Sequence, residues 1–269
     1  MRTSGIRRES IFALLRRDFR ISRSYRFAFV SDIVFGALNL AVFYFVSKTF
    51  SGASTASLQG AGSYFSFAAV GVALTTVIQG ASVGLARQVR EEQLTGTLEA
   101  LVAQPTSATE LSLGLAGFPF LFGMARATLY MGLAAPFLHV DVGEVSWFGL
   151  VVMFLVTAAA ITSIGVALGA LVLVFKRSES LVALVSFGLG ALGGALFPVS
   201  KLGSFEFLSR LVPTRPAFDG VRAALFRGEA WAGSALGLAI FAAVALPLSI
   251  WLFKAALDMT RRRGSLSQY

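Results

Sequence analysis

Very few residues in this sequence could do chemistry, because the apolar segments that dominate it contain almost no ionisable side chains. Asp32 lies a short way inside the first apolar segment, and Arg126 lies inside the third. A charge at the centre of a bilayer costs about 2.5–3.5 kcal/mol on insertion scales, so Arg126 needs a partner, water or lipid head groups. Two interpretations stay open: Arg126 lines a cavity and meets a polar or anionic group of a substrate, or it forms a structural pair. The sequence favours the structural pair.

Two uncharged polar residues, Asn39 and Gln79, also lie inside apolar segments. Such residues more often bridge helices than bind cargo. Together with Arg126 they are nevertheless the candidates for a substrate path through the membrane. A proton-driven carrier would normally carry a richer set of buried carboxylates, so this pattern weakens a secondary carrier without excluding it.

No catalytic or metal site is predicted. The chain has no cysteine and one histidine, His139, which argues against thiolate chemistry and against a multi-histidine metal centre. The sequence contains no Gly-x-x-x-x-Gly-Lys-Ser/Thr loop, no His-Glu-x-x-His helix and no Gly-x-Ser-x-Gly turn. We therefore expect that the chain is not an enzyme and has no cofactor of its own.

The most polar internal stretch runs from Arg87 to Glu110, between two apolar segments. Apolar residues recur in it at helical spacing, at Leu94, Leu98, Leu101 and Val102. This spacing predicts a short amphipathic helix over residues 94–104, which Pro105 ends. Ser107 and Glu110 form a Ser-x-x-Glu capping box that opens the next helix. The stretch is either a contact site for a partner or a solvated hairpin that only joins two spans.

The composition indicates an integral membrane protein. Of the 269 residues, 56% are apolar and 14% are charged, whereas soluble domains average roughly 45–50% and 25%. Apolar stretches of about 20 residues recur, and a helix is the structure that satisfies such a backbone in lipid. The sequence predicts an all-α membrane domain over residues 27–257. Its six spans are expected at about 27–46, 63–86, 111–138, 146–175, 180–197 and 231–252.

Three further segments flank or interrupt these spans. Residues 1–26 carry eight arginines opposite an apolar face of Ile11, Phe12, Leu15 and Phe19, which predicts an interfacial amphipathic helix, with an unstructured basic tail as the alternative. Residues 198–230 are half apolar but broken by glycine and proline, so we expect an outer re-entrant segment. Residues 258–269 form a basic tail. The distribution of Arg and Lys predicts both termini on the cytoplasmic side, and the net charge of +9 suits anionic lipid better than nucleic acid.

Two groups of residues resemble the signatures of a known family. The first follows the second span and comprises Glu92, Gly96, Thr97, Leu98, Glu99, Leu101 and Pro105. The second comprises Phe197-Pro198-Val199 after the fifth span, and Leu211-Val212-Pro213 leading to Phe218-Asp219-Gly220-Val221-Arg222. In their order and spacing these groups resemble the ABC-2 type permeases, the membrane subunits of ABC exporters. That family includes the daunorubicin-resistance and the polysaccharide or teichoic-acid export branches.

The resemblance implies a dimer of two permeases, identical or different, above two ATPase subunits on separate chains that bind ATP and magnesium. Residues 94–104 would be a coupling helix seated in a groove of the ATPase, with the N-terminal helix beside it. Residues 198–230 would form a re-entrant hairpin that closes the outer side, with Phe197 and Pro198 at a path or gate. The protein would lie in the plasma membrane of a bacterium or archaeon.

The leading hypothesis is export of an amphipathic or lipid-like molecule, such as a drug or glycolipid, powered by the separate ATPase. A stand-alone secondary carrier or channel is the alternative. A membrane scaffold that anchors a cytosolic partner without transport is a third interpretation.

Overall fold

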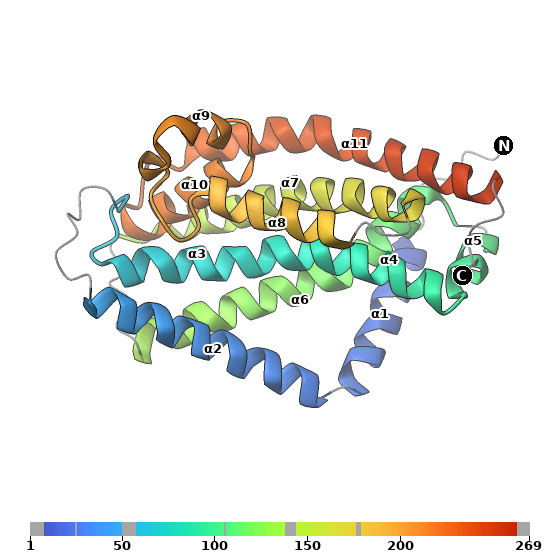
Figure 1. Cartoon of the computed structure of the whole chain (residues 1–269), viewed down its shortest axis with the longest axis horizontal. Coiled ribbons are helices and arrows are strands. Elements are labelled where there is room, and N and C mark those ends of the chain that lie inside the picture. The colour runs from blue at the N-terminus through green and yellow to red at the C-terminus, as the bar shows by residue number, and fades with distance from the viewer. Residues whose placement is uncertain are drawn as a thin grey trace.

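The computed structural model describes residues 8–24, 26–49, 58–104, 106–137, 144–175 and 179–262. Within these ranges the regular structure is helical, and they contain no strand. Five helices are long and apolar enough to cross a membrane, and they share the long direction of the molecule (Figure 1).

Four of the five long helices are single elements, α2 (Arg26–Thr49), α6 (Ala108–Phe137), α7 (Trp147–Val174) and α11 (Ala232–Arg262). The fifth is a continuous run of α3 (Tyr64–Gln79), the π-helical segment η2 (Gly80–Gly84) and α4 (Leu85–Leu94). The shorter elements are α1 (Arg8–Ser24), α5 (Thr97–Ala103), α8 (Glu179–Gly193), the 3-10 helix η3 (Val199–Phe205), α9 (Glu206–Ser209) and α10 (Thr214–Phe226). The predicted boundaries of the first, third and fourth spans lie within a few residues of α2, α6 and α7, and Leu138 lies outside the described residues.

The second span is longer than predicted, because α3, η2 and α4 form one continuous apolar helix over Tyr64–Leu94. Its start is capped by Ser63, whose hydroxyl accepts a hydrogen bond from the Ser66 N–H at 3.1 Å. Its end is set by Gly96, which has a φ of 73°, a left-handed conformation that glycine adopts without steric cost. The helix continues past residue 86, the predicted end of the span, because charged residues of α4 extend it to Leu94.

Two other boundaries also need correction. The predicted fifth span, residues 180–197, ends early: α8 has 15 residues and stops at Gly193 because Gly194 has a φ of 82°. In the described part of the chain this helix is short of the roughly 20 residues that an upright span needs, and the same residues contain five full-length candidates where six spans were expected. The last span was expected to end near residue 252, but α11 continues to Arg262, so the predicted tail over 258–269 begins inside a helix.

The elements predicted for the two sides of the membrane lie at opposite ends of the bundle. Figure 1 shows α1, α5 and the C-terminal part of α11 at one end, and α9 and α10 at the other. α10 packs against α7, α11, α8 and α3. The segment over residues 198–230 is therefore a helical cap on the bundle end far from α5.

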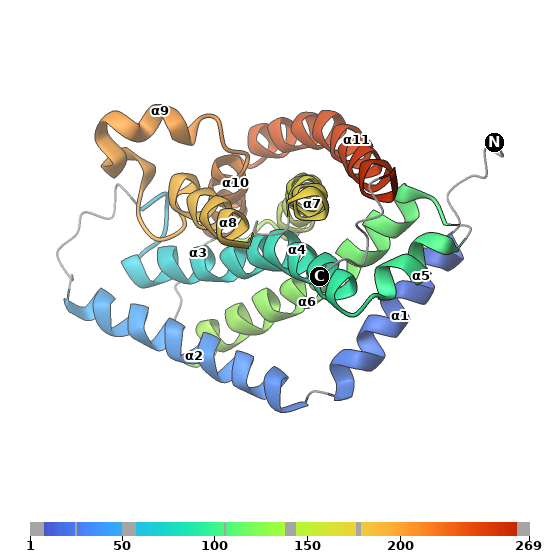
Figure 2. The ribbon, with the colours of Figure 1, turned by 45° about the vertical axis from the view of Figure 1, so that its right-hand side comes forward.

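The core of the bundle is arranged around α7, which contacts α11, α10, α4 and η2; Figure 2 shows α7 between α11 and the α3–α4 helix. Small residues allow these close approaches. A Cβ placed on Gly165 of α7 would lie 2.0 Å from the carbonyl oxygen of Ala81 in η2. Two large clusters of buried apolar residues fill the interior, and the one toward α5 includes Leu98, Leu115 and Phe253.

α1 forms a helix within residues 1–26, and one of its faces packs inside the chain. Leu14 and Leu15 pack on α6 where Gly114 and Gly117 leave room for them. Phe12 and Phe19, which were assigned to the apolar face, are 69% and 61% exposed. The helix crosses the α5 end of the bundle obliquely (Figures 1 and 2).

Candidate functional site

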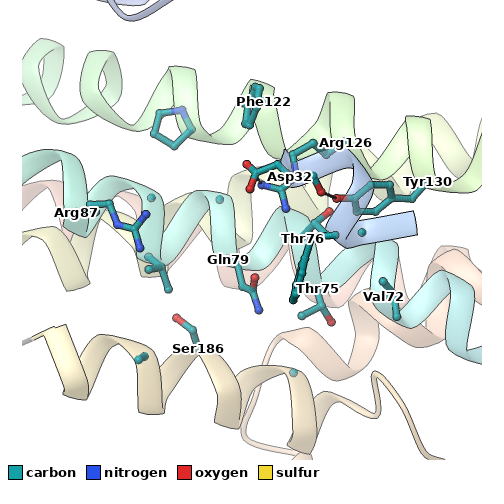
Figure 3. A pocket seen from close by; sticks show the side chains of 18 of the residues that line it. Asp32, Val72, Thr75, Thr76, Gln79, Arg87, Phe122, Arg126, Tyr130 and Ser186 are labelled. Atoms are coloured by element: carbon teal, nitrogen blue, oxygen red, sulfur yellow. Dashed lines mark hydrogen bonds and ion pairs between the residues drawn. The ribbon is translucent and has the colours of Figure 1, made fainter. Parts of the chain in front are cut away.

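A groove of about 850 Å³ runs along the α3–α4 helix. Its walls come from α2 and α6 on one side and from α8 on the other, as Figure 3 shows for Arg126, Gln79 and Ser186. It extends from charged residues of α1 and α4 to Phe197, in the turn after α8. The groove therefore connects the region of α5 with the cap formed by α10.

Four of the five residues predicted for a path or gate line this one groove: Asn39 from α2, Gln79 from α3, Arg126 from α6 and Phe197. Pro198 is not among the lining residues; it immediately precedes η3. These residues are far apart in the sequence, and the packing of α2, α3 and α6 brings them together.

Arg126 has a partner in Asp32 of α2, with 3.3 Å between the guanidinium nitrogen and the carboxylate oxygen. The guanidinium also lies over the Phe122 and Tyr130 rings, at 5.7 and 5.9 Å from their centroids. Both charged side chains face the groove (Figure 3). Arg126 thus forms the predicted ion pair within the bundle, and its side chain also lines the cavity.

The floor of the groove contains the π-helical segment η2, a type of irregularity that is frequent at functional sites. Gly80 and Gly84 of this segment meet Pro119 of α6, where an added Cβ would lie 2.7 and 2.8 Å from the Pro119 carbonyl oxygen and Cβ. The hydroxyls of Ser82 in η2 and Ser186 in α8 are 2.9 Å apart. The segment thus contacts both walls of the groove.

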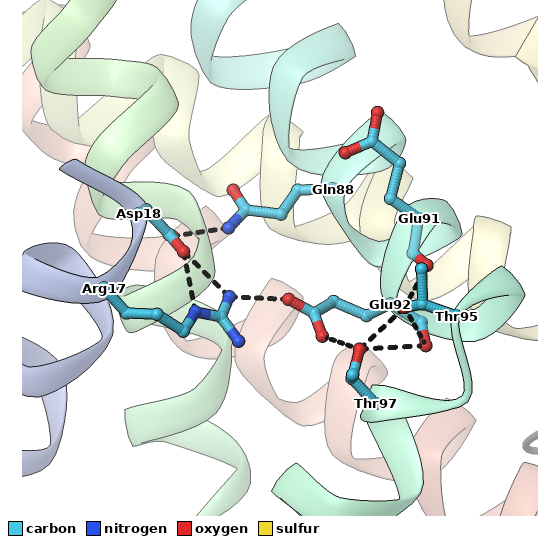
Figure 4. A network of polar contacts seen from close by, with 7 residues as sticks. All are labelled: Arg17, Asp18, Gln88, Glu91, Glu92, Thr95 and Thr97. Atoms are coloured by element: carbon cyan, nitrogen blue, oxygen red, sulfur yellow. Dashed lines mark hydrogen bonds and ion pairs between the residues drawn. The ribbon is translucent and has the colours of Figure 1, made fainter. Parts of the chain in front are cut away.

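At the α5 end, a network of polar side chains joins α1, α4 and α5 (Figure 4). Arg17 of α1 donates to Glu92 of α4 at 2.5 Å and pairs with Asp18 at 2.8 Å. Gln88 donates to Asp18 at 2.5 Å, and the Thr97 hydroxyl at the start of α5 donates to Glu92. Burial alone would lower the pKa of Arg17, but Asp18 and Glu92 outweigh it and raise that pKa. The ion pairs therefore hold Arg17 in its charged form.

The apolar face of α5 is buried within this chain, contrary to the expectation that it would insert into a partner. Leu98 is fully buried in the cluster that includes Leu85 and Leu115, and Leu101 packs partly buried against it. Leu94 belongs to α4, because α5 begins only at Thr97, so the predicted helix over 94–104 starts too early. The exposed residues of α5 are Thr97, Glu99, Ala100 and Ala103. A partner that binds α5 would therefore contact a face of polar and small side chains.

The remaining predictions for this region have mixed outcomes. Glu99 lies in the first turn of α5. The capping box is confirmed, because the Ser107 N–H donates to Glu110 at 3.1 Å and the Glu110 N–H donates to Ser107 at 3.2 Å. Pro105 lies outside the described residues. Arg261 of α11 donates to the Val102 carbonyl oxygen at 3.1 Å, so α5 is also tied to the last helix.

At the opposite end, Arg222 of α10 is fully buried. Its guanidinium donates to the carbonyl oxygens of Gly194 and Ala195 at 2.9 Å and of Phe67 at 3.1 Å, and it stacks 3.5 Å from the Phe67 ring centroid. Burial lowers the pKa of Arg222 to about 9, which Asp219 opposes, so the side chain stays charged near neutral pH. Arg222 therefore fixes α3 and α10 to the turn that ends the groove.

Sequence reasoning did not single out Arg17, Asp18 or Arg222 for these roles. The one available signal was Asp18, an acidic residue among many arginines, placed four positions after Leu14 on the same helical face. Arg222 stood inside a recognised motif without any indication that its acceptors would be backbone carbonyls. No group of three or more His, Cys, Asp or Glu in the described ranges could hold a metal ion.

Several helices long and apolar enough to cross a membrane indicate a multi-pass membrane protein, and a groove runs along one of them. The model of the ABC-2 type transporter family matches residues 9–226. The chain belongs to this family and is a permease component rather than an ATPase. Comparison with curated proteins finds no match for the sequence.

Proposed function

We propose that this chain is the membrane-spanning subunit of an ABC exporter that moves an amphipathic or lipid-like molecule along the α3–α4 groove. A separate ATPase, which would bind ATP and magnesium, drives the movement, and two permease subunits act together. The bundle end with α1 and α5 faces the cytoplasm of a bacterial or archaeal cell. The positive charges of α1, α4 and the end of α11 support this orientation.

The single observation that carries the proposal is the connection from α5 to the groove. Thr97 at the start of α5 donates to Glu92, and Glu92 itself lines the groove in the same continuous helix as Gln79. A rigid displacement of α5 would therefore move the floor of the groove through α4. Coupled displacement of packed helices is a recognised way to alternate between two open states.

The proposed docking face is the exposed side of α5, with Glu99, Ala100 and Ala103. Small residues permit close approach of a partner, and Glu99 offers a charge for an ion pair at the rim of the contact. Because Leu98 and Leu101 pack inside the chain, they support the shape of α5 and do not provide the contact.

ATP-driven efflux tests the proposal. The purified permease is reconstituted with the ATPase that co-purifies from native membranes, and release of a panel of lipids and hydrophobic dyes is followed. The proposal predicts transport that requires ATP, survives a protonophore and is lost in Glu99→Lys while the protein stays folded. Transport that is driven by a proton gradient without ATP would instead establish a secondary carrier.

A further inference from the structure

The ion pair between Asp32 and Arg126 is the charged feature in the middle of the groove. The other charged lining residues, Arg17, Asp18, Arg87, Glu91 and Glu92, come from α1 and α4. The Asp32 side chain is 50% exposed and the Arg126 side chain 25% exposed, so both charges can be reached from the cavity. Asp32 and Arg126 are not among the residues whose hydrogen bonds connect α1, α4 and α5.

Contacts other than the ion pair also hold α2 to α6. Tyr130 donates its hydroxyl to the Asp32 carbonyl oxygen at 3.0 Å, and its ring fills the space left by Gly36 of α2. These contacts hold α2 to α6 independently of the Asp32 carboxylate. The rings of Phe122 and Tyr130 likewise hold the Arg126 guanidinium in place. Separation of the two charges would therefore leave these contacts between α2 and α6 in place.

The chemistry of the pair selects the charge of a ligand. A singly charged head group could neutralise one member only, and it would leave the other charge without the partner that it has in the ion pair. A head group with one positive and one negative charge can replace both partners at once. Phe35, Phe118 and Phe187 also line the groove, so an apolar chain has a surface beside the pair.

We propose that Asp32 and Arg126 form a subsite for the zwitterionic head group of an amphiphile, with the cationic group at Asp32 and the anionic group at Arg126. The ion pair seen between them is the resting arrangement that the head group replaces. This inference rests on the proposed function, since it names the class of molecule that the groove would carry.

Equilibrium binding to the purified permease tests the subsite. Four ligands with equally long chains are titrated in an uncharged detergent and quantified by native mass spectrometry. They are palmitoyl lysophosphatidylcholine (zwitterionic), palmitoyl lysophosphatidylglycerol (anionic), hexadecyltrimethylammonium (cationic) and monopalmitoylglycerol (uncharged). We expect the zwitterion to bind at least about tenfold more tightly than the other three. Equal binding of the zwitterion and any other ligand would overturn the proposal.

Substitutions make the test specific to the pair. Asp32→Asn should shift the preference to the anionic ligand, and Arg126→Gln should shift it to the cationic ligand. The double variant, which has no net change in charge, should lose the preference. The exchanged pair, Asp32→Arg with Arg126→Asp, should recover the zwitterion preference and covers the case in which a single variant does not fold. Single variants that keep the wild-type preference would refute the subsite.

The binding assay contains neither ATP nor an ATPase. A wild-type zwitterion preference combined with no ATP-driven export would therefore contradict the proposed function and leave the subsite intact. Export without that preference would contradict the subsite alone.

Discussion

Replacing Glu92 with Gln should weaken the attachment of α1 and α5 to α4. Glu92 is 9% exposed, and its carboxylate accepts hydrogen bonds from Arg17 and Thr97. Gln keeps the shape and can still accept from Thr97, but it removes the negative charge that faces Arg17. Hydrogen bonds to charged groups contribute about 1.5–3 kcal/mol.

The expected loss lies at or just below the lower end of that range. Arg17 keeps its pair with Asp18, and its side chain is 31% exposed, so water screens the lost interaction. We expect a decrease of about 1–2 kcal/mol in the free energy of unfolding, which corresponds to about 2–8 °C in Tm for a chain of this size. The neighbouring Glu91 is exposed, and Glu91→Gln serves as the matched control.

Unfolding in detergent, followed by tryptophan fluorescence, gives the required free energies. A double-mutant cycle of Glu92→Gln with Arg17→Met should yield a coupling energy of about 1–2 kcal/mol, because the two residues contact directly. A coupling energy below about 0.3 kcal/mol, or a Tm of Glu92→Gln equal to that of Glu91→Gln, would refute the role of this ion pair.

Two further substitutions test the burial of α5 and the anchor at the opposite end. Leu98→Ala should destabilise the protein by about 2–5 kcal/mol, because Leu98 is fully buried. Leu94→Ala is the control and should change stability little, since Leu94 is 57% exposed. Equal Tm values for the two variants would show that the apolar face of α5 is free for a partner. Arg222→Met should cost about 2–6 kcal/mol, because the buried carbonyl groups of Gly194 and Ala195 each lose a donor at about 1–3 kcal/mol. Arg210→Met at an exposed position is the control, and an Arg222→Met protein as stable as this control would contradict the anchor.

The sequence was sufficient to predict the membrane class, the position of most long helices and the capping box of Ser107 and Glu110. These features depend on local patterns, namely apolar length and a fixed spacing of capping residues. The errors occurred where charged residues continue an apolar helix, as in α4 and the end of α11. A helix can continue beyond the bilayer as an amphipathic turn, so the end of the helix does not mark the end of the membrane span.

The candidate site required the tertiary structure. Asn39, Gln79 and Arg126 could be selected as polar residues in apolar segments, but only the packing of α2 against α3 and α6 shows that they share a groove. The same limitation explains the error for Leu98. Periodicity identifies the apolar face of α5. It does not identify the residues of α4 and α6 that cover this face, because their positions depend on how the chain turns before and after α5.

The proximity of α5 to a nucleotide-hydrolysing partner is the central claim, and cysteine cross-linking measures it directly. The chain has no cysteine, so Ala100→Cys on the exposed face of α5 and Lys201→Cys at the opposite end each provide a single reactive site. Treatment of native membranes with a short bifunctional reagent should link Ala100→Cys, and not Lys201→Cys, to an ABC ATPase identified by mass spectrometry. Linking of the ATPase through Lys201→Cys instead, or through neither position in membranes that export in an ATP-dependent manner, would contradict the account.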